Sequence, residues 1–414
     1  MLKCPITTAA TTTTTTAASE AYSASGVPVL EARELSKHYG RKTALDRVSF
    51  SVPPESFVVI LGPAGAGKTT TLRLLAGLER ESGGDILMSG ESVAGLEPKD
   101  RDIAMIFDNL ALYPHKTGFQ NIAGPLLERK LPREEIKRRV GAVAAKLRIE
   151  HVLERLPKTM SGGERQRTAL GRALVRSPRV FLLDEPLSSL DAPLRFELRA
   201  ELKRLQREEG RTFLMATPDF AEALAVADTV LLLRSGKIVQ ASPPEDLYDY
   251  PVDCEAALFV GSPQIAVLHA EFREGLIHCA GLAFPLPTAL EEAAEHMLRA
   301  GPGGFLLGIR PENVRVLFSS PSAPEAGGWT GIPGARDHAV GQVTDIESLG
   351  LRSVITVRCG REQVGMLCSA AQRAQIRIGQ DLAFTVADRE RLTAFDRVSR
   401  RNILRRAGGR VFEL

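Results

Sequence analysis

The 414-residue sequence lacks any apolar run that approaches the roughly 18–20 residues needed to cross a bilayer as a helix. Its five cysteines include no C-x-x-C pair, and such an odd, scattered set is typical of reduced cytosolic thiols and indicates no zinc site. Positive charge is barely in surplus, with 53 Lys and Arg against 50 Asp and Glu. This surplus is too small to imply binding to nucleic acid or to an anionic membrane surface, so partners must be inferred from local sites.

The overall composition is that of a soluble globular protein. Hydrophobic residues make up 44% of the chain and charged residues 25%, which excludes a wholly disordered, collagen-like or transmembrane chain. At roughly 100–200 residues per domain, the length predicts two or three domains.

The first 27 residues are rich in Thr, Ala and Ser, with six consecutive threonines at 11–16. They offer too little apolar surface to offset the entropy lost on ordering, so we expect a disordered tail. A secretory signal is the competing interpretation, but the continuous apolar region of such a signal is missing. A translation start placed too far upstream is a third interpretation.

Residues 28–260 alternate short apolar runs with amphipathic stretches, which predicts an α/β domain with a largely parallel sheet. The expected buried strands are FVVIL (57–61), IAMIF (103–107), VFLL (180–183), TFLMA (212–216) and TVLLL (229–233). From about 110 to 160 the strand pattern disappears and charged, helix-prone sequence indicates a helical insert.

Residues 261–414 have a different residue pattern, which predicts a small, mostly β domain. Short alternating segments such as VGQVTDI (340–346), SVITVRC (353–359) and LAFTV (382–386) are separated by Gly, Pro and charged turns. The Pro-, Gly- and Ser-rich stretch 319–337 is expected to be a long loop.

A complete phosphate-loop motif, G-x-x-x-x-G-K-T, follows the first expected strand and precedes a helical stretch. Glycines let backbone N–H groups turn toward phosphate oxygens, and the positive end of the following helix faces the same point. Lys68 is expected to reach the β- and γ-phosphates, and the Thr69 hydroxyl to ligate Mg²⁺. The nucleotide-contacting residues would be Gly62, Pro63, Ala64, Gly65, Ala66, Gly67, Lys68, Thr69 and Thr70. A glycine-rich turn that binds nothing is disfavoured by the strand and helix on either side.

The run VFLLDE (180–185) would carry Asp184 and Glu185 to the carboxyl edge of the sheet, where open α/β sheets bind ligands. Asp184 is expected to hold the Mg²⁺ shell and Glu185 to polarise the attacking water as a base. A strand that ends in a solvated acidic turn is the alternative, and the complete phosphate loop makes it the weaker one.

Three further motifs stand in order around these two: an aromatic at Tyr39, Met160-Ser-Gly-Gly-Glu-Arg-Gln166, and Ser188-Ser-Leu-Asp191. Together the five elements resemble the nucleotide-binding subunit of an ATP-binding cassette (ABC) transporter over residues 29–260. The resemblance implies that two such domains sandwich two ATP molecules, each between one phosphate loop and the partner's Ser161-Gly162-Gly163-Glu164 segment. It also assigns Asp191 to the site and stacks Tyr39 on adenine. A purely structural alternative exists for two of these features. The Ser161–Glu164 segment would then be only a helix-capping box, and Tyr39 only an aromatic that packs at a strand end.

The subtype is indicated by ALYPH (111–115), LDAPLR (190–195), GSP (261–263), GIRPE (308–312) and a late FD (395–396). These motifs resemble importers of the maltose and glycerol-phosphate type, whose additional domain is an OB-like fold. That resemblance implies a peripheral subunit on the cytoplasmic face of the inner membrane. Its implied partners are two transmembrane permease subunits, a second ABC ATPase subunit and, indirectly, an extracytoplasmic solute-binding protein, but no nucleic acid.

Two positions depart from the family pattern. Asp108 stands where a glutamine usually senses Mg²⁺ and water, and it adds a negative charge and lacks amide donors. Pro218 stands where a histidine usually contacts the γ-phosphate, and its side chain offers no donor or acceptor. Pro218 is also a candidate for the first position of the helix that follows. Glu164 in place of glutamine is a milder change, because the serine and glycine donors remain.

The sequence therefore predicts an ATP-hydrolysing, energy-coupling subunit of an importer for a sugar, polyol or glycerol-phosphate-like solute. The two departures add the hypothesis that it forms one half of an asymmetric ATPase pair. A largely non-hydrolytic regulatory subunit is the alternative, which Asp108 and Pro218 favour and Glu185 disfavours. A soluble ABC ATPase acting on nucleic acid is disfavoured by the single phosphate loop and the small net charge.

Overall fold

A computed structural model describes residues 27–188, 190–293, 304–318 and 335–404. The chain divides into two compact units: the first extends to Pro218 and includes Val226–Ile238, and the second contains Asp219–Ala225 and the chain from Val239 onward. Each unit is considered by itself. Residues 1–26 of the expected tail (1–27) and residues 319–334 of the expected loop (319–337) lie outside the described residues. The division after residue 260 stays a prediction.

A parallel sheet forms the centre of the first unit, in the order β9-β3-β8-β7-β6. All five strands expected from the apolar runs are present: β3 (Phe57–Leu61), β6 (Ile103–Ile106), β7 (Val180–Asp184), β8 (Thr212–Thr217) and β9 (Thr229–Arg234). They are almost fully buried, as expected for strands covered on both faces. β10 (Lys237–Ser242) runs from the first unit into the second.

Three phenylalanines on adjacent strands form the aromatic centre of this sheet. Phe213 of β8 stacks on Phe57 of β3 and on Phe181 of β7, with 5.0 Å between ring centroids in both pairs. All three rings have no solvent exposure. Burying rings of this size contributes roughly 2–3 kcal/mol each, so the strands that carry the site lie on a well-packed support.

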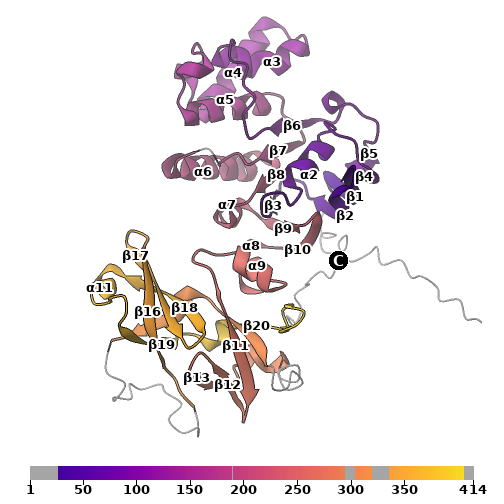
Figure 1. Cartoon of the computed structure of the whole chain (residues 1–414). Coiled ribbons are helices and arrows are strands. Elements are labelled where there is room, and N and C mark those ends of the chain that lie inside the picture. The colour runs from indigo at the N-terminus through magenta and orange to yellow at the C-terminus, as the bar shows by residue number, and fades with distance from the viewer. Residues whose placement is uncertain (1–26, 189, 294–303, 319–334, 405–414) are drawn as a thin grey trace, which may run out of the picture. The chain divides into compact units, whose positions relative to one another are not determined.

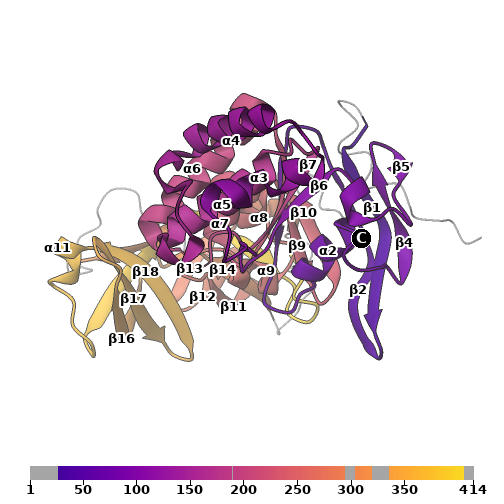
Figure 2. The ribbon, with the colours of Figure 1, turned by 90° about the horizontal axis from the view of Figure 1, so that it is seen from above.

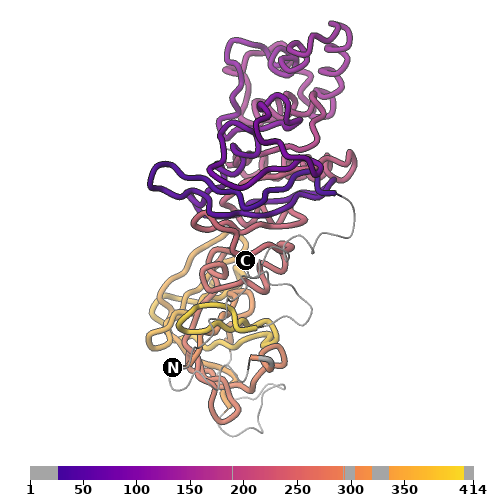
Figure 3. The backbone as a smooth tube through the Cα atoms, turned by 90° about the vertical axis from the view of Figure 1, so that its right-hand side faces the viewer, coloured from indigo at the N-terminus to yellow at the C-terminus, as the bar shows by residue number. Residues whose placement is uncertain are grey.

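An antiparallel sheet, in the order β2-β1-β4-β5, forms a second layer of the first unit. Figure 2 shows these four strands together, on the side of the unit away from α4, and Figure 3 shows the projecting hairpin of the first two in indigo. Their bounds are β1 (Leu30–Tyr39), β2 (Lys42–Val52), β4 (Gly83–Met88) and β5 (Glu91–Ser92).

The helices of the first unit include the predicted insert. Figure 1 shows α3, α4 and α5 grouped together, beyond the β6 edge of the parallel sheet. The bounds are α2 (Lys68–Leu75), α3 (Gly118–Glu128), α4 (Arg133–Leu147), α5 (Gly162–Leu174) and α6 (Ala192–Glu209), with 3₁₀ turns at Pro98–Asp100, Glu150–Val152 and Pro157–Thr159. No strand lies between α3 and α5, as expected from the charged sequence there.

The second unit is mostly β, as predicted. One antiparallel sheet has the order β13-β12-β11-β14-β20 and the other β15-β19-β16-β17-β18. The strands are β11 (Ala266–Arg273), β12 (Leu276–Cys279), β13 (Leu282–Pro285), β14 (Phe305–Ile309), β15 (Val314–Leu317), β16 (Ala339–Ser348), β17 (Arg352–Cys359), β18 (Glu362–Ser369), β19 (Asp381–Val386) and β20 (Thr393–Phe395). Residues of both sheets share one apolar core, among them Phe284, Phe305 and Phe384.

Short helices complete the second unit: α7 (Phe220–Val226), α8 (Pro244–Asp249), α9 (Cys254–Phe259) and α11 (Ala370–Arg373), with 3₁₀ turns at Thr288–Ala293, Pro311–Asn313 and Arg389–Arg391. Among the residues that the structure describes, no helix is both long enough and apolar enough to cross a bilayer.

Candidate functional site

The phosphate loop occupies the turn between β3 and α2, where the sequence predicts it. Gly65 and Gly67 have φ values of 78° and 111°, a region that side-chain-bearing residues rarely adopt. A Cβ atom on Gly62 would lie 2.2 Å from the Leu233 carbonyl oxygen, and one on Gly67 would lie 2.7 Å from the Ala44 carbonyl oxygen. Glycine at these positions therefore lets the backbone turn tightly at the beginning of α2. Pro63, Ala64, Ala66 and Thr70 complete this turn and the first residues of α2.

Lys68 points back along the loop. Its side chain is only 4% exposed, and its Nζ donates to the carbonyl oxygens of Gly62 and Pro63, at 3.0 and 3.1 Å. The same atom lies 3.6 Å from Oε1 of Glu185. The ammonium group is thus held inside the loop, where it can meet an anion.

Thr69 and Asp184 are joined, although they lie 115 positions apart in the sequence. The Thr69 hydroxyl donates to Oδ1 of Asp184 across 3.1 Å. Asp184 ends β7 and is 3% exposed. Burial raises the pKa of Asp184, and the negative charges of Asp108 and Glu185 raise it further, while the Thr69 hydrogen bond opposes the rise. A hydroxyl beside a carboxylate that is crowded by other carboxylates suits a divalent cation.

Glu185 follows Asp184 in an unusual backbone conformation. Its φ is 45°, and its N–H donates to the Ala216 carbonyl oxygen of the neighbouring strand at 2.9 Å. Non-glycine residues with such φ values are uncommon and are found more often at functional sites. The side chain remains 32% exposed, so solvent can reach the carboxylate that faces Lys68.

Asp108 lies at the same edge of the sheet. In the parallel pair of β6 and β7, Ile106 aligns with Leu183, so Asp108, two residues on, follows the strand next to Glu185. Its Oδ1 accepts the N–H of Asn109 at 2.8 Å. The structure therefore brings three carboxylates, those of Asp108, Asp184 and Glu185, to one edge beside the phosphate loop.

Tyr39 ends β1 with its side chain partly exposed. Its hydroxyl donates to Glu79, and burial together with this hydrogen bond raises the pKa of Tyr39. Hydrogen bonding with Thr70, two residues after Lys68, links the phenol to the phosphate-loop helix. The residue is 45% exposed, which leaves ring surface that a flat heterocycle can stack on.

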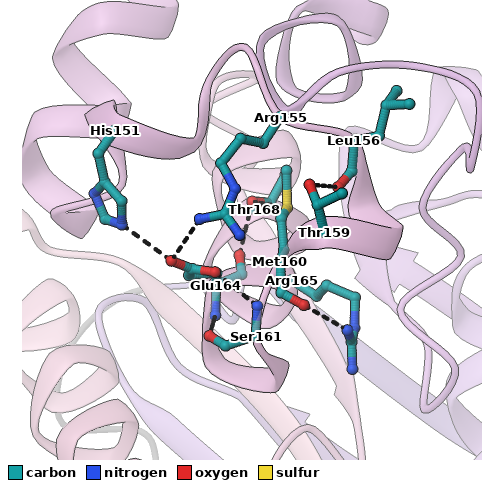
Figure 4. A network of polar contacts seen from close by, with 9 residues as sticks. All are labelled: His151, Arg155, Leu156, Thr159, Met160, Ser161, Glu164, Arg165 and Thr168. Atoms are coloured by element: carbon teal, nitrogen blue, oxygen red, sulfur yellow. Dashed lines mark hydrogen bonds and ion pairs between the residues drawn. The ribbon is translucent and has the colours of Figure 1, made fainter.

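The Ser161–Glu164 segment begins α5 with a capping box, drawn in Figure 4. Ser161 Oγ accepts the Glu164 N–H at 3.2 Å, and Glu164 Oε2 accepts the Ser161 N–H at 2.6 Å. A Cβ on Gly163 would lie 2.9 Å from Leu194, so glycine permits close packing against α6. The alternative that Ser161 and Glu164 form a helix-capping box is therefore confirmed. Within the described residues, this segment makes no hydrogen bond to the phosphate loop.

Two residues that the sequence analysis did not single out hold Glu164. His151 Nε2 lies 3.0 Å, and Arg155 Nη1 3.2 Å, from Oε1 of Glu164. The backbone hydrogen bond from Ser161 is the main cause that lowers the pKa of Glu164, and His151 and Arg155 lower it further against the opposing effect of burial. The only hint in the sequence is a basic residue nine positions before the glutamate.

Asp191 caps α6, since its side chain accepts the Leu194 N–H at 3.0 Å. Ser189, next to it in the motif, lies outside the described residues. The expectation that Pro218 begins the following helix is wrong: α7 begins at Phe220, and Asp219 accepts the Ala221 N–H in the capping position. An aspartate acceptor satisfies a helix-terminal N–H that proline at that place would not.

Comparison with known protein families finds two models along the chain. One described as "ABC transporter" matches residues 45–188, and one described as "TOBE domain" matches residues 307–393. The first match contains the phosphate loop, Ser161–Glu164, Asp184 and Glu185, and the second lies in the β-rich unit.

Relatives with long alignments include three import proteins. The chain is 39% identical over 375 residues to the trehalose/maltose import ATP-binding protein MalK of Thermococcus litoralis, covering 88% of this chain and 96% of that protein. It is 44% identical over 282 residues to the sn-glycerol-3-phosphate import ATP-binding protein UgpC of Brucella abortus (68% and 76% covered). It is 42% identical over 286 residues to the oligosaccharides import ATP-binding protein MsmX of Bacillus subtilis (69% and 78% covered).

Among solved structures, cbiO1 of Clostridium perfringens, described as part of the ABC transporter complex cbiONQ, is similar with a TM-score of 0.50 and 28% identity. That similarity covers 53% of this chain and 90% of cbiO1.

Proposed function

Since this chain belongs to the ATP-binding subunits of ABC transporters, we propose that it hydrolyses ATP at the phosphate-loop edge to drive import of a sugar, polyol or glycerol-phosphate-like solute. ATP hydrolysis is the activity of this family, and the names of the MalK, UgpC and MsmX relatives describe the import of such solutes. The observation that carries the proposal is the convergence of Lys68 and Thr69 with Asp184 and Glu185.

ATP would be held by the loop Gly62–Thr70. Lys68, buried and already turned toward the loop carbonyl groups, would exchange those contacts for oxygens of the β- and γ-phosphates. The first N–H groups of α2 would donate to the same phosphates, and the exposed ring of Tyr39 would stack on the adenine.

The residues present fit a Mg²⁺ ion. The Thr69 hydroxyl and the Asp184 carboxylate lie 3.1 Å apart, and both are oxygen donors of the kind that Mg²⁺ prefers. Thr69 and Asp184 would hold the ion, with Asp108 close enough along the edge to influence it. When bound, Mg²⁺ supplies charge neutralisation at the phosphate oxygens.

Glu185 would act as the general base. Its carboxylate is not one of the two expected Mg²⁺ ligands, Thr69 and Asp184, and it is partly open to solvent. It can therefore accept a proton from the attacking water. Lys68 would stabilise negative charge that develops on the transferred phosphoryl group. Removing one such contact typically costs about 10²–10³ in rate.

Import ATP-binding subunits dimerise and work with membrane permease components. For this chain we propose two transmembrane permease subunits, a solute-binding protein reached through them, and a position on the cytoplasmic face of the inner membrane. Ser161, Gly162, Gly163 and Glu164 would meet the ATP held by the other ATPase subunit, and Asp191 would lie beside them.

A second candidate is an asymmetric pair in which a different ATPase chain carries the faster site. Pro218 supports it, because proline follows β8 where a donor would be needed, and Asp108 adds a charge beside Asp184. Retention of Glu185 argues against the fully non-hydrolytic alternative.

The test is the subunit inventory of the complex recovered from membranes through a tag on this chain, together with its ATPase rate. Two permease proteins and Mg²⁺-dependent ATP hydrolysis that Glu185→Gln abolishes would support the proposed function. A different cassette chain in the complex would support the asymmetric pair, whereas a rapid homodimer would exclude it. No permease and no hydrolysis would overturn the main proposal.

A further inference from the structure

Glu79 lies shortly after α2, in the turn that leads to β4. The N–H groups of Leu78 and Glu79 both donate to the Arg73 carbonyl oxygen, at 2.9 and 3.4 Å, so the turn folds back onto the end of the helix. The Glu79 side chain is 22% exposed. Polar groups of β1 and of α2 converge on its carboxylate: Lys37, Tyr39 and Arg73. The helix that begins at the phosphate loop is therefore followed by a carboxylate that faces the expected adenine platform.

The Glu79 carboxylate is ionised at neutral pH. Lys37 Nζ lies 3.5 Å from its Oε2, and Arg73 Nη1 lies 3.6 Å from its Oε1. Burial opposes ionisation, but the hydrogen bond from Tyr39 and the charges of Lys37 and Arg73 outweigh it and lower the pKa of Glu79. The Tyr39 hydroxyl therefore donates to an anion, and such hydrogen bonds are roughly twice as strong as those between neutral groups.

The Tyr39 ring is held at two points. Its hydroxyl is bonded to Glu79, and the Lys37 ammonium lies over one face of the ring, 4.9 Å from the centroid. Lys37 is itself fixed, because its Nζ donates to the Arg80 carbonyl oxygen at 2.7 Å and its side chain is only 14% exposed. A cation covers one face of the ring, so the opposite face is the one left for a flat base.

Backbone contacts fix the turn against β1. The Ser82 N–H donates to the Ser36 carbonyl oxygen at 2.8 Å, and the Ser82 hydroxyl accepts the His38 N–H at 3.0 Å. The carboxylate and the phenol are therefore carried by two segments that are bonded to each other. A ring that is fixed in advance loses less freedom when a base stacks on it, which gains roughly two- to tenfold in affinity for one side chain.

We propose that Glu79 is a positioning residue for ATP, which holds the Tyr39 ring through the phenol hydroxyl so that adenine stacks on the face away from Lys37. The inference rests on the proposed function, because it takes ATP as the ligand of the phosphate loop. The observation behind it is that a carboxylate at the tip of the ring and a cation over its face hold the same side chain. Glu79 acts through Tyr39, so its loss affects binding of the base and not of the phosphates.

The test is calorimetric titration of the full chain, in Mg²⁺, with ADP and with inorganic pyrophosphate, which has two phosphates and no base. Glu79→Leu removes the acceptor, and Tyr39→Phe removes the donor but keeps the ring. We expect each variant to weaken ADP binding about fivefold and to leave pyrophosphate binding unchanged. The double variant should bind ADP no more weakly than either single variant, because both changes remove the same hydrogen bond. Glu79→Gln keeps an acceptor and should restore most of the ADP affinity.

Glu91→Leu, which changes an exposed carboxylate of β5, is the matched control and should leave both affinities unchanged. Equal weakening of ADP and pyrophosphate in Glu79→Leu would assign Glu79 to support of the phosphate loop and overturn the positioning role. Additive losses in the double variant would overturn it as well. Tyr39→Phe removes only a hydroxyl, so unchanged ADP affinity in that variant overturns the proposal even where Glu79→Leu does not fold.

The two proposals fail in different ways. If neither ADP nor pyrophosphate bound the unaltered chain, the ATPase proposal would be wrong, and this inference with it. If both bound and the variants at Glu79 and Tyr39 had no effect, only the positioning role would be lost.

Discussion

Arg155 Nη1 lies 3.2 Å from Oε1 of Glu164, so a cation that precedes the Ser161–Glu164 segment is paired with the carboxylate that closes its capping box. His151 Nε2 meets the same oxygen at 3.0 Å, while the other oxygen accepts the Ser161 N–H. Three groups therefore hold the Glu164 carboxylate at the beginning of α5. A negative charge at this helix N-terminus would repel a phosphate, and the positive charge of Arg155 offsets it.

Glu164→Gln should keep the geometry of the capping box but lose the negative charge that strengthens the hydrogen bonds to this side chain. The folded-state pKa of Glu164 is lowered, so its contribution is fully present above the unfolded value near 4.3 and is lost as the pH falls through the folded value. We expect the variant to be less stable by about 1 kcal/mol at pH 7. The difference should shrink as the pH falls below about 4.3 and through the lower folded-state pKa, as measured by denaturant unfolding over that fall in pH. A constant difference at every pH would contradict the electrostatic account.

Arg310, within the GIRPE motif, should be a stability residue of the second unit. It is 7% exposed, and it donates to the carbonyl oxygens of Ala257, Val260 and Tyr248 at 2.6–3.1 Å. Arg310→Met would leave these three acceptors without their donor, at a cost of about 2–4 kcal/mol. The measurement is the denaturant midpoint of the full chain. Arg315→Met, at an exposed position of β15, is the matched control, and equal losses in both variants would contradict the assignment.

Most of the site at the carboxyl edge of the parallel sheet could be predicted from the sequence, because its motifs are local. The apolar run 57–61 and the glycines after it determine a strand and a tight turn in consecutive residues, and VFLLDE places its two carboxylates in the same way. Parallel pairing then aligns the strand ends, so Asp108 and Glu185 lie at the same edge of the sheet without any further information from the sequence.

The remaining contacts depend on side chains that reach across loops. His151 and Arg155 approach Glu164 from a 3₁₀ turn and the residues after it, and no periodic pattern encodes that approach. Lys146 meets Glu209 across 63 positions, so this contact exists only once the helices have packed. The start of α7 was mispredicted because a proline signal was preferred to the aspartate cap beside it.

Glu185→Gln should separate binding from hydrolysis. The amide keeps the size of the carboxylate but cannot accept a proton, so we expect the ATP turnover rate to fall by about 10²–10⁴-fold. ATP affinity should change little, because Lys68 and the loop backbone make the expected phosphate contacts. Turnover is measured with the assembled transporter and affinity by titration with labelled ATP. Glu91→Gln, at an exposed position of β5, is the control, and unchanged turnover in Glu185→Gln would rule out the general-base role.

Pro218→His tests whether the residue after β8 limits turnover at this chain's own site. The backbone N–H of Gly62 donates to the Thr217 carbonyl oxygen at 3.3 Å, so the residue that follows Thr217 is tied closely to the phosphate loop. An imidazole there would add a donor for charge that develops on the phosphoryl group, and we expect turnover to rise by about 10²-fold. Pro218→Ala is the matched control, because it removes the ring without supplying a donor. If histidine and alanine raise the rate equally, backbone restriction by proline is the cause. If neither changes it, the slow-site hypothesis is wrong, and the rate is set elsewhere in the transport cycle.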